Sequence, residues 1–285
     1  MIIIKLEGGL GNQMFQYALG RNLSLIHDTP FKVDVSYLEK ENQSGRTLRI
    51  DNFKTLLNKA AEDEISSYRS TIQKILDRLR PISKRKKILE LSPEFDPRVL
   101  KRADGYFVGH WNNERYFKSS EDAVRKDFEL KQPLGTLAQQ VAEEILSEPE
   151  SVSVHIRRGD YVSIPKIAAV HRTLPLSYYQ EACGKILEKK PNAVFFVSSD
   201  DIIWAKDNFP KEFRTVFVSS PEIPDYEEMT LISQCKHQII ANSTFSWWGA
   251  WLNQNPEKIV IAPKQWFTDP NRKIGGLIPK SWIQI

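Results

Sequence analysis

Hydrophobic and polar positions follow their most regular pattern in the second half of the chain, after Pro149. Residues 151–156 place Val152, Val154 and Ile156 on one side of an extended segment, which is the two-residue period of a strand. Short apolar runs then alternate with stretches of helical period, a pattern typical of a parallel, doubly wound sheet. The expected strands are 151–156, 193–197, 215–218, 238–241 and 258–262, and the expected helices are 177–189, 202–208, 226–235 and 245–253.

The first half opens on an apolar run at residues 2–6, of the kind that parallel sheets bury. A glycine turn follows, and Asn12 is a candidate N-cap for the next helix. The fold class expected from both halves is α/β, with one domain over residues 1–149 and a second over 150–285. The other elements expected in the first half are strands at 31–35 and 106–111 and helices at 63–79, 121–128 and 137–146.

Composition narrows the class of protein only modestly. The chain has 285 residues, of which 41% are hydrophobic, and its net charge of +4 is too small to argue for nucleic-acid binding. Two cysteines build no disulfide framework, and no apolar run reaches the roughly 18 residues of a membrane span. The basic run Lys84, Arg85, Lys86 and Lys87 is either a solvated loop or a patch that rests on anionic lipid.

The glycine turn Gly-Gly-Leu-Gly-Asn-Gln at residues 8–13 is a first candidate site. Glycines let a ligand approach the backbone closely, and the helix that follows offers free N–H groups to an anion. The glycine spacing differs from the dinucleotide fingerprint. The alternative is a plain strand-to-helix turn whose glycines supply positive φ.

A second candidate site follows the strand at 151–156, where Arg157 and Arg158 are adjacent. Two arginines at the end of a buried strand are costly unless they are paired. A phosphate is a suitable partner because guanidinium binds it through two hydrogen bonds. Asp160 can pair with one arginine and fix its pose. The alternative is a structural arginine–aspartate pair at a domain interface.

A third candidate site spans residues 241–251, where a helix opens after a strand. Ser243 or Thr244 can cap this helix while its first N–H groups hold an anion. The three tryptophans Trp247, Trp248 and Trp251 exceed what one helix needs for packing, although they are also compatible with a core role.

Acidic residues follow two other predicted strands. Asp200 and Asp201 can accept hydrogen bonds from a nucleotide or cap the helix after them, and Glu228 lies in the first turn of another helix. The chain has no Asp-x-Asp pair and no phosphate-loop motif. A diphosphate would therefore be neutralised by arginine and helix N-termini.

Together these segments resemble the α-1,2-fucosyltransferases of bacteria and animals. The resemblance rests on residues 8–18, 155–161 and 242–251, with a further similar segment at 109–117. It implies a GT-B-like architecture of two Rossmann-like domains with the donor cleft between them. It also implies an inverting enzyme that moves L-fucose from GDP-β-L-fucose to the 2-hydroxyl of a terminal β-galactoside, with no metal and no other cofactor.

The resemblance also assigns roles to individual residues. Arg157 would hold the donor diphosphate, with Asp160 and His155 nearby as candidate bases and Arg158 beside it or locked to Asp160. His110 and Trp111 would lie on the acceptor side, and Glu228 stands where an aspartate is expected, which leaves its role open. The donor-binding set comprises Gly11, Asn12, Gln13, Arg158, Asp200, Asn242, Ser243, Thr244 and Phe245.

Three alternatives remain open at the level of sequence. The chain could use the same donor with another acceptor, such as a protein or a different oligosaccharide. It could also be a non-catalytic nucleotide- or glycan-binding protein, or a scaffold on a membrane surface that binds through the basic run. The expected partners are GDP-fucose and a galactoside glycan, with no nucleic acid. The expected location is the cytoplasm, with peripheral contact at the inner membrane face.

Overall fold

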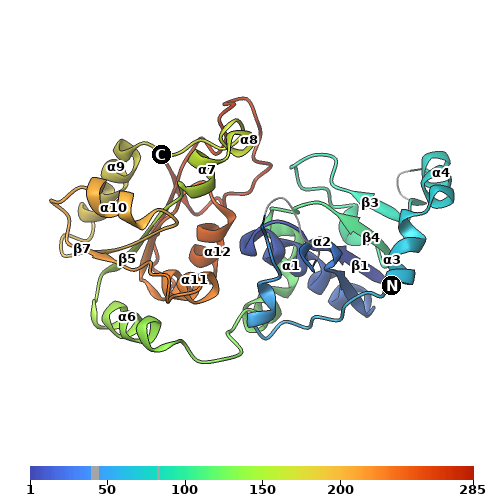
Figure 1. Cartoon of the computed structure of the whole chain (residues 1–285), viewed down its shortest axis with the longest axis horizontal. Coiled ribbons are helices and arrows are strands. Elements are labelled where there is room, and N and C mark those ends of the chain that lie inside the picture. The colour runs from blue at the N-terminus through green and yellow to red at the C-terminus, as the bar shows by residue number, and fades with distance from the viewer. Residues whose placement is uncertain (40–44, 82–83) are drawn as a thin grey trace. The chain divides into compact units, whose positions relative to one another are not determined.

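The computed structural model describes residues 1–39, 45–81 and 84–285, which form two compact α/β units (Figure 1). The first unit comprises Met1–Lys131 and Ile274–Leu277, and the second comprises Gln132–Lys273 and Ile278–Ile285. The division falls after Lys131 rather than after residue 149. The reason is that the helix expected at 137–146 buries its apolar face in the core of the second unit.

The first unit is built on a parallel sheet in the order β2-β1-β4-β3. The edge strand β3 was not predicted because it is only three residues long and begins with the last residue of the basic run, Lys87. Residues 63–79, where at least one helix was expected, form two helices, since Ser70 caps the second one by accepting the Gln73 N–H at 3.1 Å. The elements are β1 Ile2–Lys5, α1 Leu10–His27, β2 Phe31–Asp34, α2 Ser36–Glu39, α3 Glu62–Arg69, α4 Thr71–Leu79, β3 Lys87–Leu89, β4 Gly105–Val108 and α5 Glu121–Asp127.

The second unit contains a parallel sheet in the order β10-β9-β8-β5-β6-β7, which confirms the doubly wound pattern. All five expected strands form, and the C-terminal edge strand β10 is added to them. The elements are α6 Thr136–Ser147, β5 Ser151–Ile156, α7 Gly159–Ser163, α8 Pro165–Ala168, α9 Leu176–Leu187, β6 Val194–Ser199, α10 Ile202–Asn208, β7 Thr215–Phe217, α11 Asp225–Gln234, β8 His237–Ile239, α12 Thr244–Leu252, β9 Val260–Ala262 and β10 Ile283–Gln284.

Both faces of this second sheet are covered by helices. Val152, Val154 and Ile156 of β5 share one cluster with side chains of α9 and α10, as their two-residue spacing predicted. Side chains of α6 and α11 cover the other face. The three tryptophans of α12 are core residues: all are buried, and the Trp247 ring lies 5.6 Å from that of Trp282.

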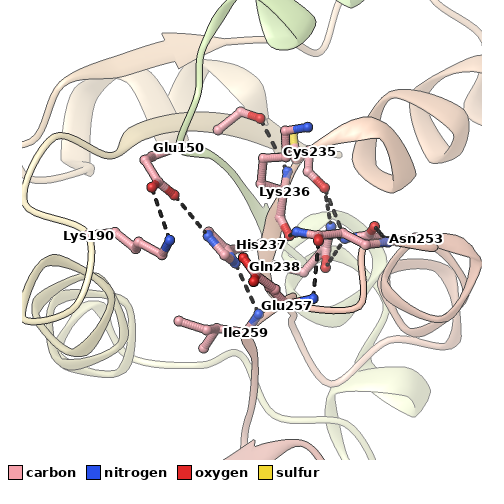
Figure 2. Close-up of polar contacts among 11 residues, drawn as sticks. Glu150, Lys190, Cys235, Lys236, His237, Gln238, Asn253, Glu257 and Ile259 are labelled. Atoms are coloured by element: carbon pink, nitrogen blue, oxygen red, sulfur yellow. Dashed lines mark hydrogen bonds and ion pairs between the residues drawn. The ribbon is translucent and has the colours of Figure 1, made fainter.

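The amino ends of β5 and β8 carry a polar cluster around His237 (Figure 2). Its Nδ1 accepts the Ile259 backbone N–H at 3.0 Å, so the ring proton is on Nε2 and is donated to Glu150 at 3.2 Å. Glu150 also pairs with Lys190 at 3.0 Å. Asn253 donates to the carbonyl of Cys235 at 3.0 Å and to the side chain of Gln238. The cluster links β5, β8 and β9 at their amino ends, whereas the candidate site residues follow the carboxyl ends of the strands.

We expect this cluster to make the fold sensitive to acid. Burial lowers the pKa of His237, and Lys190 adds to that effect while Glu150 opposes it. Because the folded pKa lies below the ordinary value of about 6.5, the unfolded chain takes up the proton first. The contribution of His237 to the free energy of unfolding is therefore full above about pH 6.5 and is lost as the pH falls below that value.

The measurement is urea unfolding at neutral and mildly acidic pH, in the wild type and in His237→Asn. Asparagine keeps an acceptor for the Ile259 N–H but does not titrate, so the variant is expected to lose less stability on acidification. Equal losses in the two proteins would show that His237 does not carry the effect.

Candidate functional site

The second sheet has a topological switch point between β5 and β8. From β5 the chain proceeds through β6 and β7 on one side, then returns to β8 and continues outward on the other side. Ligands of open α/β sheets bind at such a point, beyond the carboxyl ends of the strands. Arg157 directly follows β5, and the N-terminus of α12 follows β8. Two of the three segments singled out in the sequence therefore meet at this place in the fold.

Arg157 is held between two carboxylates. One terminal nitrogen lies 2.6 Å from Asp160 Oδ1 and the other lies 3.1 Å from Asp200 Oδ2. Burial disfavours its charge, but Asp200 and Asp160 outweigh this effect and raise the pKa of Arg157. The predicted pairing of Asp160 with an arginine is confirmed, and that arginine is Arg157. The guanidinium is thus charged and fixed in direction at the strand end.

Arg158 takes a different direction from its neighbour. Its Nε lies 3.4 Å from Asp201, and its guanidinium lies 3.9 Å from the centre of the Trp204 ring. The expected alternative, Arg158 locked to Asp160, is therefore wrong. It fails because Asp160 is one helical turn beyond Arg157, on the same side.

Asp200 and Asp201 have different roles, and of the two roles that the sequence left open only the helix cap is present. Asp201 caps α10 by accepting the Trp204 N–H at 3.3 Å. Asp200 accepts the Arg158 backbone N–H at 2.8 Å in addition to pairing with Arg157. A Cβ at Gly159 would lie 2.5 Å from the Asp200 carboxylate, so the glycine allows this close approach. Asp200 thus positions both arginines.

The N-terminus of α12 supplies the second half of the site. Ser243 caps the helix, with its hydroxyl accepting the Phe245 N–H at 3.3 Å. Thr244 and Phe245 are half-buried and lie in the first turn. Such a helix start attracts anions because its N–H groups and dipole point outward.

Asn242 holds the loops around this helix start. It is fully buried, and its Nδ2 donates to the carbonyls of Arg172 at 2.9 Å and Trp266 at 2.7 Å. The backbone carbonyl of Asn242 accepts a hydrogen bond from the Tyr161 hydroxyl at 2.9 Å. This geometry favours a positioning role over direct contact with a donor.

His155 does not fit the role of general base. It is buried within β5, with its ring 5.2 Å from that of Phe245. Burial lowers the pKa of His155 to about 3, and the charge of Arg157 adds to the effect. A weakly basic, inaccessible imidazole is a poor proton acceptor. The two-residue period already placed His155 on a face of a buried strand.

Glu228 belongs to the surroundings of Arg157, which the sequence alone did not indicate. Burial raises the pKa of Glu228 to about 7, a hydrogen bond with Ser219 lowers it, and Asp200 and Asp225 add to the rise. The charge of Arg157 acts in the opposite direction. A carboxyl group that titrates near neutrality beside an arginine is a recognised sign of a functional site.

The glycine turn lies in the first unit and is a strand-to-helix turn with positive φ at Gly8. The helix begins at Leu10 with Gly9 as its N-cap, so the prediction of Asn12 as N-cap is wrong. A Cβ at Gly8 would lie 2.6 Å from the Asn12 side chain, which therefore packs over the turn. Gly11 is buried, whereas Asn12 is half-buried.

Gln13 is a structural residue of this turn. Its side chain has no exposed surface; it donates to the carbonyls of Gly8 at 3.0 Å and Thr47 at 2.8 Å and accepts the Arg49 N–H at 2.9 Å. These bonds fix Thr47 and Arg49 against the turn. Its assignment to donor binding is at odds with this burial, because no face of the amide is left for a ligand.

The two acceptor-side candidates differ in their exposure. His110 is exposed, with its backbone N–H 2.7 Å from a Glu90 carboxylate oxygen. Trp111 is buried against Phe107 and Tyr116 and adopts φ 58°, so it is a core residue rather than an exposed contact. Its left-handed backbone costs about 1–3 kcal/mol and turns the chain sharply beyond β4.

Residues 1–39, 45–81 and 84–285 contain neither a cluster of metal ligands nor a membrane-spanning helix. In those ranges, no three His, Cys, Asp or Glu residues are grouped so as to hold a metal ion. None of the helices there combines the length and apolar character that crossing a bilayer requires.

Two α/β units, each built on a parallel sheet, are the fold of the GT-B class of glycosyltransferases. The chain belongs to glycosyl transferase family 11, whose model matches residues 1–285. It is 33% identical to the alpha-1,2-colitosyltransferase of Escherichia coli over 100% of this chain and 99% of the relative. It is 31% identical to the O-antigen biosynthesis glycosyltransferase WbnK of Escherichia coli over 98% and 99% of the two chains.

More distant matches agree with this family. Human galactoside alpha-(1,2)-fucosyltransferase 1 is 26% identical over 48% of this chain and 40% of its own. A mutant of FUT1 from Arabidopsis thaliana, solved in complex with GDP, shares the fold with a TM-score of 0.51 at 11% identity, covering 91% of this chain and 69% of that one. The protein is a fucosyltransferase-like glycosyltransferase, as the sequence motifs predicted.

Proposed function

We propose that the chain transfers L-fucose from GDP-β-L-fucose to the 2-hydroxyl of a terminal β-galactoside, with inversion at the anomeric carbon. The observation that carries the proposal is Arg157, a charged guanidinium fixed by Asp160 and Asp200 at the switch point of the second sheet. The human relative and one Escherichia coli relative are named as α-1,2 transferases, which supports an α-1,2 linkage in the product.

The reaction is a single displacement. The acceptor 2-hydroxyl forms a bond to the anomeric carbon as the bond to the diphosphate oxygen breaks, and GDP leaves with the electron pair. Arg157 and the N–H groups that open α12 stabilise the growing negative charge. We assign the acceptor proton to Asp160, because His155, the other candidate base, is buried. These groups take the part that a divalent metal plays elsewhere, so we expect activity to survive EDTA.

A second donor is favoured by one observation, the 33% identity with a colitosyltransferase over the whole chain. Colitose is L-fucose without its 3-hydroxyl, so both sugars present the same anomeric carbon to the same diphosphate. The choice between them depends on contacts to one hydroxyl group.

The test measures GDP release from GDP-fucose and GDP-colitose in EDTA, with lactose, N-acetyllactosamine and other β-galactosides as acceptors. Acceptor-dependent release from GDP-fucose would support the proposal, and preferential release from GDP-colitose would support the second donor. Binding without turnover for any acceptor would favour a non-catalytic nucleotide-binding protein. Absence of binding to either donor would overturn both assignments.

A further inference from the structure

Helix α4 of the first unit exposes its apolar side. Ile72, Ile75, Leu76 and Leu79 follow the i, i+3, i+4, i+7 spacing and form one stripe. Their relative exposures are 73%, 51%, 39% and 79%. In a helix that packs on its own domain, such a stripe would face the core. Figure 1 shows α4 beside α3 at one end of the first unit.

The polar side of α4 is the side that is fixed to the protein. Asp77 is buried and accepts the backbone N–H groups of Lys86 at 3.0 Å and Lys87 at 2.9 Å. Gln73 donates to the same carboxylate at 2.8 Å. Because these bonds hold the helix against the segment that leads into β3, the apolar stripe is directed outward by the fold itself.

Positive charge is concentrated in this segment of the chain. Residues 70–91 contain seven Lys or Arg and two acidic residues, a net charge of +5, while the whole chain carries +4. One of the two acidic residues is the buried Asp77. Arg78 on the helix and Lys84 just after it are exposed, and Lys86 pairs with Asp104. The rest of the chain has a net charge of −1.

We propose that α4 and the described basic residues after it, residues 70–81 and 84–91, form a docking surface for an anionic lipid bilayer. A helix with an exposed apolar stripe and basic flanks lies in the interface of such a membrane, where the stripe enters the acyl boundary and the cations meet the headgroups. A second copy of the chain is a poor occupant, because it would bring two segments of charge +5 together. The proposal does not depend on the transferase activity.

The test is sedimentation of the full chain with vesicles of phosphatidylcholine alone or of equal parts phosphatidylcholine and phosphatidylglycerol. We expect binding to the vesicles that contain phosphatidylglycerol and little to the neutral ones. Raising the salt from roughly 0.1 M to about 1 M should weaken that binding, since the Debye length falls from about 10 Å to about 3 Å. Equal binding to both vesicles would overturn the role of the basic segment.

Two substitutions separate the stripe from the charge. Leu79→Ser should weaken binding about tenfold, the effect of withdrawing one large apolar side chain from the acyl region. Lys84→Glu should weaken it about 25-fold, at about fivefold for each unit of charge. The matched controls are Leu146→Ser and Lys211→Glu, exposed positions in the second unit that should leave binding unchanged.

Melting curves of all four variants should coincide with that of the wild type, because every substituted side chain is exposed. Unchanged binding of Leu79→Ser and Lys84→Glu would overturn the proposal. So would a concentration-dependent dimer that Leu79→Ser abolishes, since the stripe would then be an interface between two copies of the chain.

Discussion

Replacing Arg157 by alanine is expected to lower kcat for acceptor-dependent GDP release by about 10²–10³, the usual effect of removing one charge-stabilising group from a transition state. The guanidinium is fixed by Asp160 at 2.6 Å and Asp200 at 3.1 Å before any ligand arrives. Its orientation therefore costs nothing further at the moment when charge builds up on the departing diphosphate.

Two further variants make this result specific. Arg157→Lys keeps the charge but cannot bridge two carboxylates and a phosphate, so its activity should stay well below that of the wild type. Arg158→Ala removes the neighbouring charge, which is engaged with Asp201 and Trp204, and should cost about tenfold or less.

Unfolding curves must accompany these measurements, because loss of Arg157 leaves Asp160 and Asp200 facing the site without their counter-ion. If folded Arg157→Ala retains nearly full activity, the arginine and its two aspartates are a structural ion-pair network. That outcome is the alternative that the sequence left open.

The second sheet was predictable because its central strands are buried and differ in period from the helices between them. The alternating residues of β5 and the apolar run of β6 contrast with the helical stretches, and α10 matches its expected bounds. Parallel strands also have their carboxyl ends on one side of the sheet, so Arg157 and Ser243, which follow β5 and β8, lie at the same end of it.

The roles of individual side chains were less predictable, because burial is a tertiary property. Gln13 and Trp111 lie in motifs typical of a binding site, yet loop residues far along the chain cover Gln13 and aromatic rings cover Trp111. His155 alternates with apolar residues that face one core, and its own side of β5 is buried as well. The motifs therefore identified the region of the site. The burial of each side chain then shows whether it can contact a ligand or has a structural role.

Glu228 shows the converse error. The resemblance singled it out but left its role open, and its place in the first turn of α11 did not separate it from Asp225 and Glu227. Its importance comes from Ser219 and Asp200, which lie on other elements, and from its own burial. An ordinary carboxyl in the first turn of a helix would be ionised and would help the helix dipole. Because the pKa of Glu228 is raised to about 7, the charge of the site changes with pH near neutrality.

Replacing Glu228 by glutamine is expected to stabilise the protein above neutral pH by about 3 kcal/mol, because a pKa raised from 4.5 to about 7 disfavours the ionised form in the fold. The sign follows from proton uptake: between those two values the folded chain holds more protons than the unfolded chain. The stability that Glu228 contributes is thus full below pH 4.5 and is lost as the pH rises through about 7. Urea unfolding at several pH values, with wild type and variant side by side, measures the difference in slope.

The ionisation of Glu228 should also change the affinity for the donor. Above neutral pH, a negative Glu228 lies within electrostatic reach of Arg157 and adds to the charge of Asp200, so it opposes an anionic diphosphate. The affinity for GDP-fucose, whose diphosphate does not titrate in this range, is expected to fall several-fold from pH 6 to pH 8 in the wild type and to stay level in Glu228→Gln. Glu222→Gln, an exposed substitution near α11, is the matched control and should behave as the wild type does. A parallel decline in all three proteins would assign the pH dependence to another group and leave Glu228 with a structural role alone.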